Sequence, residues 1–211
     1  MDKHKRAVTD KLIERTVKAL CANNYDAHYI QSPDALVEKL AEYLPEGASC
    51  SVGGSMTLFE TGTMDYLKSR EDLEYYDRYA PDANIPEVFY KALGCDVYLT
   101  SSNAITEDGL LYNVDGTGNR VAALTYGPKK VVVIAGVNKL VKDLEQARLR
   151  MREVAAPANC VRLNLPNPCV KTGHCMDCRS DTYICVTEVV TKRQRVKNRI
   201  AVLILPDEYG Y

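Results

Sequence analysis

Short apolar runs alternate with amphipathic helical patterns along most of this 211-residue chain. The clearest run spans residues 130–135, and three others have the same character: residues 48–52, 95–100 and 200–205. Between the runs, apolar residues recur at helical spacing with charged residues among them. Because strands that are joined through helices can pair in parallel, this order predicts an α/β fold, with a mostly parallel sheet and helices on both faces.

Capping signals predict where two of the helices begin. Ser32 followed by Pro33 is typical of a cap and a first helical residue, and the pattern predicts a helix that continues to about Leu44. Asn138 is predicted to cap a long helix that carries Leu144 on its apolar face. We divide the chain into an N-terminal helical segment and an α/β domain that includes a cysteine-rich segment, with the respective bounds 1–45, 46–211 and 166–186.

The composition indicates which classes of partner the protein binds and in which cellular compartment it lies. The chain has 27 basic and 28 acidic residues, so its charge does not favour nucleic acid, and the basic run 192–199 is typical of a solvated face. No apolar run approaches membrane-spanning length, and the first residues form no apolar signal segment. Eight cysteines without a secretion signal are typical of a reducing compartment. We therefore expect a cytoplasmic protein with no nucleic-acid or membrane partner, and a homo-oligomer stays open.

Four cysteines cluster near the end of the chain with the spacing C-x5-C-x2-C-x6-C: Cys169, Cys175, Cys178 and Cys185. Soft thiolates select zinc or iron–sulfur centres, so the cluster predicts a metal centre. Disulfides or inert buried thiols are the alternatives. The other four cysteines are scattered and are interpreted as inert: Cys21, Cys50, Cys95 and Cys160.

A glycine-bearing loop follows the strand predicted at residues 48–52. Its glycines allow a sharp turn and can direct backbone N–H groups toward an anion, to which nearby hydroxyls can also donate. The candidate ligand-binding residues of this loop are Gly53, Gly54, Ser55 and Thr57. An ordinary strand–helix turn is the alternative.

A second polar segment, residues 100–120, follows another predicted strand. It contributes Asp115, Asn119 and Arg120 as ligand-binding candidates, and Asn103 and Glu107 as catalytic candidates. A hairpin at Asp108-Gly109 would explain the glycine but not Glu107, Asn119 or Arg120. Since ligands bind outside the carboxyl ends of parallel strands, we expect the two segments to share one crevice that holds a small anionic metabolite.

The motifs GGSMTLFETG, TSSNAITEDGLLYNVDGTGNRVAAL, YGPKKVVVIAGVNKLV and AAPANCVRLNLPNPCVKTGHCMDC resemble the lactate-utilisation (LUD-domain) family. The resemblance runs from about Ser51 to the last residue. It implies a branch of the isomerase/CoA-transferase-like superfamily, with a Rossmann-like α/β fold that binds sugar phosphates, CoA thioesters or folates. It also implies a part in the oxidation of L-lactate to pyruvate alongside iron–sulfur partner proteins.

The resemblance includes one informative departure. By this resemblance, isomerases of the superfamily carry a Gly-Ala-Asp motif at the position where this chain has Ser101-Ser102-Asn103. An amide cannot accept a proton as a carboxylate does, so Glu107 becomes the candidate base, and Glu60 is a further carboxylate near the loops.

The sequence is therefore compatible with three functions. The first is an accessory or redox protein of organic-acid use, with an iron–sulfur cluster as the expected cofactor and zinc or no metal as alternatives. The second is an isomerase or acyl-CoA-transferase-type enzyme, and the third is a metabolite-sensing regulator. We favour the first because the cysteine cluster has no part in isomerase chemistry.

Overall fold

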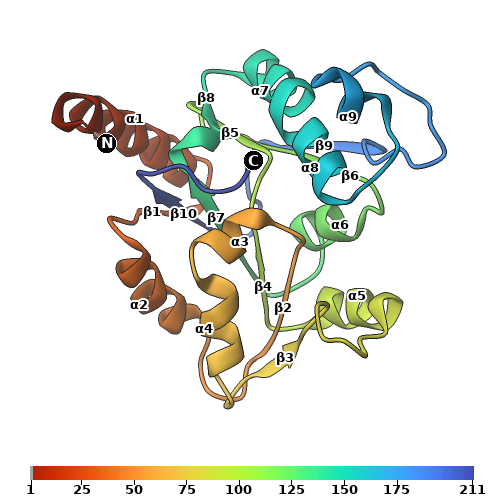
Figure 1. The fold of residues 1–211 in the computed structure, drawn as a ribbon. Helices are drawn as coiled ribbons and strands as arrows, with labels where there is room; N and C mark the ends of the chain where they lie inside the picture. Colours follow the sequence, from red (N-terminus) through yellow and green to blue (C-terminus); the bar gives the residue numbers. More distant parts are fainter. Residues whose placement is uncertain (1) are drawn as a thin grey trace.

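A computed structural model describes residues 2–211, and its largest element is a six-stranded sheet (Figure 1). The strands stand in the order β1-β10-β7-β4-β2-β3, and every neighbouring pair is parallel. Their bounds are β1 (Asp26–Tyr29), β2 (Ser49–Val52), β3 (Glu74–Tyr76), β4 (Val97–Thr100), β7 (Lys130–Gly136) and β10 (Ile200–Leu205). The four apolar runs in the sequence are thus strands of one parallel sheet, which confirms the α/β prediction.

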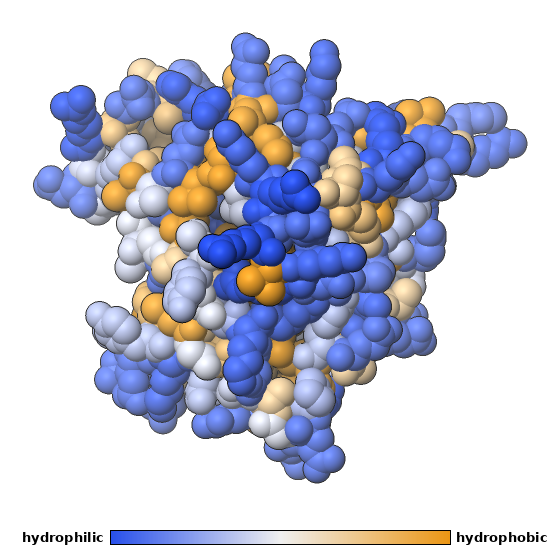
Figure 2. Space-filling view, turned by 180° about the vertical axis from the view of Figure 1, so that it is seen from behind, coloured by the Kyte–Doolittle hydropathy of each residue, from blue (hydrophilic) through white to orange (hydrophobic). Residues whose placement is uncertain are grey.

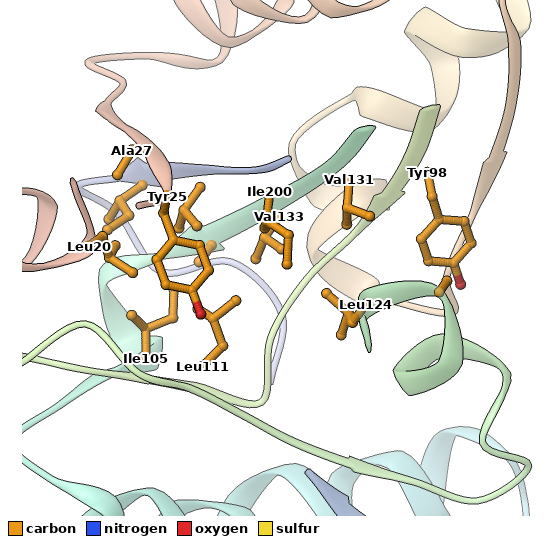
Figure 3. Close-up of a cluster of buried hydrophobic side chains, with 14 of the residues drawn as sticks. Leu20, Tyr25, Ala27, Tyr98, Ile105, Leu111, Leu124, Val131, Val133 and Ile200 are labelled. Atoms are coloured by element: carbon orange, nitrogen blue, oxygen red, sulfur yellow. The ribbon is translucent and has the colours of Figure 1, made fainter. Parts of the chain in front are cut away.

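The neighbouring strands β7 and β10 form the inner part of the core. Val131 and Val133 of β7 point to one face of the sheet, and Val132 and Ile134 point to the other, as the period of two requires. All four side chains are fully buried. Figure 3 shows the first face, where Val131 and Val133 lie among side chains from distant parts of the chain. Strands that are buried on both faces contain continuous apolar runs, which is why these strands could be predicted.

Helices cover both faces of the sheet. One face is covered by α1 (Lys3–Ala22), α5 (Ile85–Gly94) and α6 (Asn119–Thr125). The other face is covered by α2 (Pro33–Tyr43), α3 (Met56–Glu60) and α4 (Thr63–Ser69). The predicted start of α2 is confirmed, because Ser32 Oγ accepts a hydrogen bond from Ala35 N and Pro33 is the first helical residue.

A second, smaller sheet packs beside the main one and was not predicted. Its order is β8-β5-β6-β9, with antiparallel β5–β6 and β6–β9 pairs. Its strands are β5 (Ala104–Thr106), β6 (Leu111–Asp115), β8 (Leu140–Val141) and β9 (Thr187–Thr191). The helical elements that pack on this side are η1 (Val137–Lys139), α7 (Leu144–Arg150), the π-helical turn η2 (Met151–Ala155), α8 (Ala156–Arg162) and α9 (Pro168–Thr172). Figure 1 shows this layer at the upper right, over the carboxyl ends of the main strands.

The structure tests two local predictions, a helix cap and a hairpin. The prediction that Asn138 caps a helix is wrong: Asn138 lies in η1, and the cap is Asp143, whose side chain accepts from Gln146 N. The hairpin at Asp108-Gly109 is present, since β5 and β6 pair across it and Gly109 has a φ of 83°.

The predicted N-terminal segment, residues 1–45, contains α1 and α2 and also β1, which pairs with β10. Its separation from the domain at 46–211 stays a prediction. No helix within the described residues is long and apolar enough to cross a membrane. The face of the molecule opposite to that in Figure 1 is mostly hydrophilic, with hydrophobic atoms in scattered groups (Figure 2).

Candidate functional site

Two loops that follow neighbouring strands of the main sheet line one crevice. One loop follows β2 and the other follows β4, and these two strands pair in parallel. Their carboxyl ends therefore lie at the same edge of the sheet, where ligands bind in such folds. The crevice has a volume of about 230 Å³. Six of the predicted catalytic and ligand-binding residues line it: Gly54, Ser55, Asn103, Asp115, Asn119 and Arg120.

Gly53 and Thr57 support the crevice from behind instead of lining it. A Cβ atom on Gly53 would lie 2.7 Å from Thr100 Oγ1 and 3.0 Å from the Tyr98 hydroxyl, so only glycine allows this close approach of β2 and β4. Thr57 is fully buried, and its Oγ1 donates to the Tyr209 carbonyl at 3.0 Å. Both residues therefore position the β2–α3 loop.

Glu107 lies outside the crevice. Its Oε2 accepts a hydrogen bond from Arg15 Nε of α1 at 2.7 Å. The reason is the path of β5, which begins next to Asn103 at the crevice and carries the chain away before Glu107. Glu60 does not line the crevice either, and its Oε2 accepts a hydrogen bond from Gly210 N at 2.6 Å. Neither glutamate is placed to act as a base or nucleophile on a molecule in the crevice.

Arg120 connects the β4–β5 loop to β6. Its guanidinium donates to Asn103 Oδ1 at 3.0 Å, to the Val114 carbonyl at 2.7 Å, and also to Asn113 Oδ1 and the Ser101 carbonyl. Arg120 is only 9% exposed, and all of these acceptors are neutral. The positive charge is therefore buried at the crevice wall without a carboxylate partner.

Three further basic side chains line the crevice, none of which was predicted from the sequence: Arg78, Lys139 and Arg162. Arg78 stacks on Phe89, 4.8 Å from the ring centroid, and has no hydrogen bond or ion pair within residues 2–211. Arg162 donates to Asn159 Oδ1 at 2.7 Å. Lys139 Nζ donates to the main-chain oxygen of Tyr211 at 2.8 Å. Sequence patterns could not identify these residues, because they come from three separate segments: the loop after β3, η1 and α8.

Asp115 is the only acidic side chain that lines the crevice within the described residues. Its Oδ2 accepts from Val121 N at 3.0 Å, in the first turn of α6. The carboxylate therefore holds the start of that helix and does not form an ion pair with any crevice cation. Three arginines against one occupied carboxylate give the crevice a positive potential, which attracts anions.

Ser101 adds an unused hydroxyl at the same wall. It is 4% exposed, and its Oγ has no hydrogen-bond partner within residues 2–211. A buried polar group without a partner costs free energy, so a bound molecule that accepts or donates a hydrogen bond here would remove that cost.

The four clustered cysteines line a second pocket of about 210 Å³, next to the crevice. Cys160, which the sequence analysis interpreted as inert, lines it too. As the side chains lie, no group of three or more His, Cys, Asp or Glu residues among residues 2–211 is arranged to hold a metal ion. The four cysteines predicted to form a metal centre therefore share one pocket, but their sulfurs are not gathered around one point in this structure.

Two thiols in this pocket, those of Cys169 and Cys185, are held in their neutral form. Burial, followed by the hydrogen bond to Cys160, raises the pKa of Cys169 to about 11. Burial and the neighbouring Cys175 raise the pKa of Cys185 to about 12. A thiophilic cation would reverse both effects by stabilising the thiolates, so this set of donors suits zinc or an iron–sulfur cluster.

The two pockets adjoin. Cys185, Ile184 and Met151 line both of them, as do Val114 and Ala156. A group bound by the cysteines would therefore lie next to a molecule bound in the crevice.

The chain is thus an α/β protein with a Rossmann-like parallel sheet and a crevice at the carboxyl edge of that sheet. Residues 13–205 match the family model for the LUD domain. The chain belongs to the LUD-domain family, as its motifs implied.

One solved structure supports the fold independently. The crystal structure of a DUF162 family protein from Deinococcus radiodurans has a TM-score of 0.51 to this chain and 13% sequence identity. The similarity covers 93% of this chain and 97% of that chain. At this identity the similarity concerns the fold alone. No curated protein matches the chain.

Proposed function

We propose that this LUD-domain protein binds a small anionic metabolite in its crevice and serves in organic-acid utilisation, with L-lactate use as the role that the family implies. The observation that carries the proposal is the set of three arginines around a crevice whose single carboxylate, Asp115, already accepts a hydrogen bond from the first turn of α6. A carboxylate or phosphate would neutralise these cations and accept their free donors. Arg78 contributes most to the argument, because its donors have no partner within residues 2–211.

The test is direct binding by the full chain of L-lactate, pyruvate, inorganic phosphate and a sugar phosphate, measured by calorimetry and by thermal shift. Arg78→Ala should weaken the binding of the preferred anion about tenfold, because a charge-assisted hydrogen bond contributes roughly 1.5–3 kcal/mol. Arg195→Ala is the matched control, since Arg195 is exposed and does not line the crevice.

The result is decisive in both directions. Equal affinity in the Arg78→Ala and Arg195→Ala proteins would remove Arg78 from the site. An absence of binding for every anion in the panel, by folded protein, would overturn the proposed function.

The second part of the proposal is that the cysteine pocket holds a metal centre, with an iron–sulfur cluster preferred over zinc. Its support is that Cys169, Cys175, Cys178 and Cys185 line one pocket beside the crevice. Such a centre would supply electron transfer or a Lewis acid next to the bound anion. It would also suit work beside iron–sulfur partner proteins, which is the accessory role that the family resemblance implies.

Protein purified without oxygen should contain iron, or zinc, and Cys175→Ser should abolish its retention. Cys21→Ser is the matched control, since Cys21 is an exposed thiol outside the pocket. Metal analysis and a visible spectrum distinguish the two metals. Colourless anaerobic protein with neither metal near one equivalent per chain would contradict this part of the proposal.

The competing enzyme function has less support. An isomerase or acyl-transferase that uses Glu107 would need this carboxylate in the crevice, but Glu107 pairs with Arg15. A metabolite-sensing regulator would use the same cations, and it differs from the proposal in leaving the bound anion unchanged.

A further inference from the structure

Lys139 differs from every other lysine within residues 2–211, because it alone is buried, with 2% of its surface exposed. It lies at the end of η1, which follows directly from the central strand β7. Its side chain lines the crevice, and its Nζ donates to the main-chain oxygen of Tyr211 at 2.8 Å. Within residues 2–211, no carboxylate side chain forms an ion pair with Lys139.

The charged groups that face Lys139 come from three helices: Arg150 of α7, Arg120 of α6 and Glu60 of α3. Burial has the largest effect on the pKa of Lys139 and lowers it. The two arginines also lower this pKa, whereas Glu60 raises it. Together they lower the pKa of Lys139 to about 7. Near neutral pH a large share of this side chain is therefore the neutral amine.

A purely structural role does not account for this arrangement. An ammonium group that is buried near two guanidinium groups costs free energy, whereas an apolar side chain of similar length would fill the space without that cost. As a neutral amine, Lys139 keeps a lone pair that the hydrogen bond to Tyr211 does not use. A desolvated lysine with cationic neighbours is how proteins make an amine nucleophilic at neutral pH.

The crevice therefore combines cations that suit a carboxylate with an amine that suits a carbonyl. We propose that Lys139 forms an imine with the carbonyl carbon of a small 2-oxo acid whose carboxylate is held by the crevice cations. This proposal rests on the proposed anion binding and names the chemical class of the anion. The crevice of about 230 Å³ suits a compact molecule of this kind.

The chemistry balances without an oxidant or a reductant. The Nζ lone pair attacks the carbonyl carbon, and a proton moves from nitrogen to the carbonyl oxygen to give a carbinolamine. Loss of the hydroxyl with the remaining amine proton releases one water molecule and leaves a C=N bond. Protonation of that nitrogen by solvent gives an iminium ion, and water reverses every step.

The experiment traps the imine in the full-length protein. Glyoxylate or pyruvate is added with sodium cyanoborohydride, which reduces an imine to a stable secondary amine, and peptide mass mapping locates the adduct. At pH 7 we expect Lys139 to be modified more than about tenfold faster than the exposed Lys142, because burial and two cationic neighbours favour the neutral, nucleophilic amine of Lys139. Its modification rate should rise with pH to a plateau above about 7, whereas the rate for an ordinary solvent-exposed lysine keeps rising toward pH 10.

Lys139→Met should lose the preferential adduct, and Lys142→Arg is the control that should keep it. Mapping of the wild-type protein decides the question even if Lys139→Met folds poorly. If glyoxylate binds by calorimetry but Lys139 is modified no faster than Lys142, the imine proposal is overturned and the anion site stands. If neither glyoxylate, pyruvate nor any other anion binds, the imine proposal and the proposed function both fail.

Discussion

At the scale of single residues, Asp26 connects three elements of the main fold. Its Oδ2 accepts from Lys130 Nζ at 2.9 Å and from the Tyr43 hydroxyl at 2.8 Å, and its Oδ1 lies 2.7 Å from His28 Nε2. Burial on its own would raise the pKa of Asp26, but these hydrogen bonds outweigh it and lower the pKa to about 2. The carboxylate is thus stabilised in the folded state, where it joins β1, α2 and β7.

The lowered pKa makes the contribution of Asp26 dependent on pH. Because the folded pKa lies below the unfolded one, the stabilisation is fully present above about pH 4 and is lost as the pH falls toward 2. We expect Asp26→Asn to cost about 2 kcal/mol at pH 6 and much less at pH 2.5. Urea unfolding at the two pH values measures this, with the exposed Asp82→Asn as the control. An equal cost at both values would exclude the carboxylate as the source.

At the scale of elements, the β5–β6 hairpin is locked against α1. Gly109 forms its turn with a φ of 83°, and an added Cβ atom would lie 2.8 Å from both Ala19 C and Leu20 N. Asn23 Nδ2 also donates to the carbonyls of Asp108 and Gly109, at 3.0 and 3.1 Å. The hairpin thus links the second sheet to α1, which packs on the main sheet.

Gly109→Ala should therefore lower the free energy of unfolding by more than its φ alone would explain. Gly47 has a φ of 77° with open space around the position of a Cβ atom, so Gly47→Ala isolates the cost of the backbone conformation, roughly 1 kcal/mol. The clash with the α1 backbone should raise the cost of Gly109→Ala to about 3 kcal/mol. Chemical denaturation compares the two variants, and equal losses would mean that the hairpin is not held against α1.

At the scale of the whole molecule, the crevice lies where the two sheets meet. The main sheet contributes the loops after β2 and β4, and the second layer contributes β6, η2 and α8. Arg150 joins these parts, since it donates from α7 to the carbonyls of Asn138 and Asn103, both at 2.7 Å. The chain end contributes as well, through Tyr211 at the wall and the Gly210 carbonyl, which accepts from Asn138 Nδ2. The site is therefore a property of the assembled fold.

The sequence by itself determined the parallel sheet and the edge at which the site lies. The strands β7 and β10 are buried on both faces, so their apolar runs could not be solvated and were visible without any tertiary information. The start of α2 was equally local, because Ser32 and Pro33 act within one turn. The two polar loops followed from the rule that parallel strands end at one edge.

Only the tertiary structure decided which side chains meet at that edge. β5 has three residues and β8 has two, too few for an alternating pattern, so the second sheet and the departure of Glu107 from the crevice were not visible. Arg78, Lys139 and Cys160 lie far apart in the chain and carry no spacing signal. Their burial and charged neighbours, which set the chemistry of Lys139 and of the thiols, arise only when distant segments pack together.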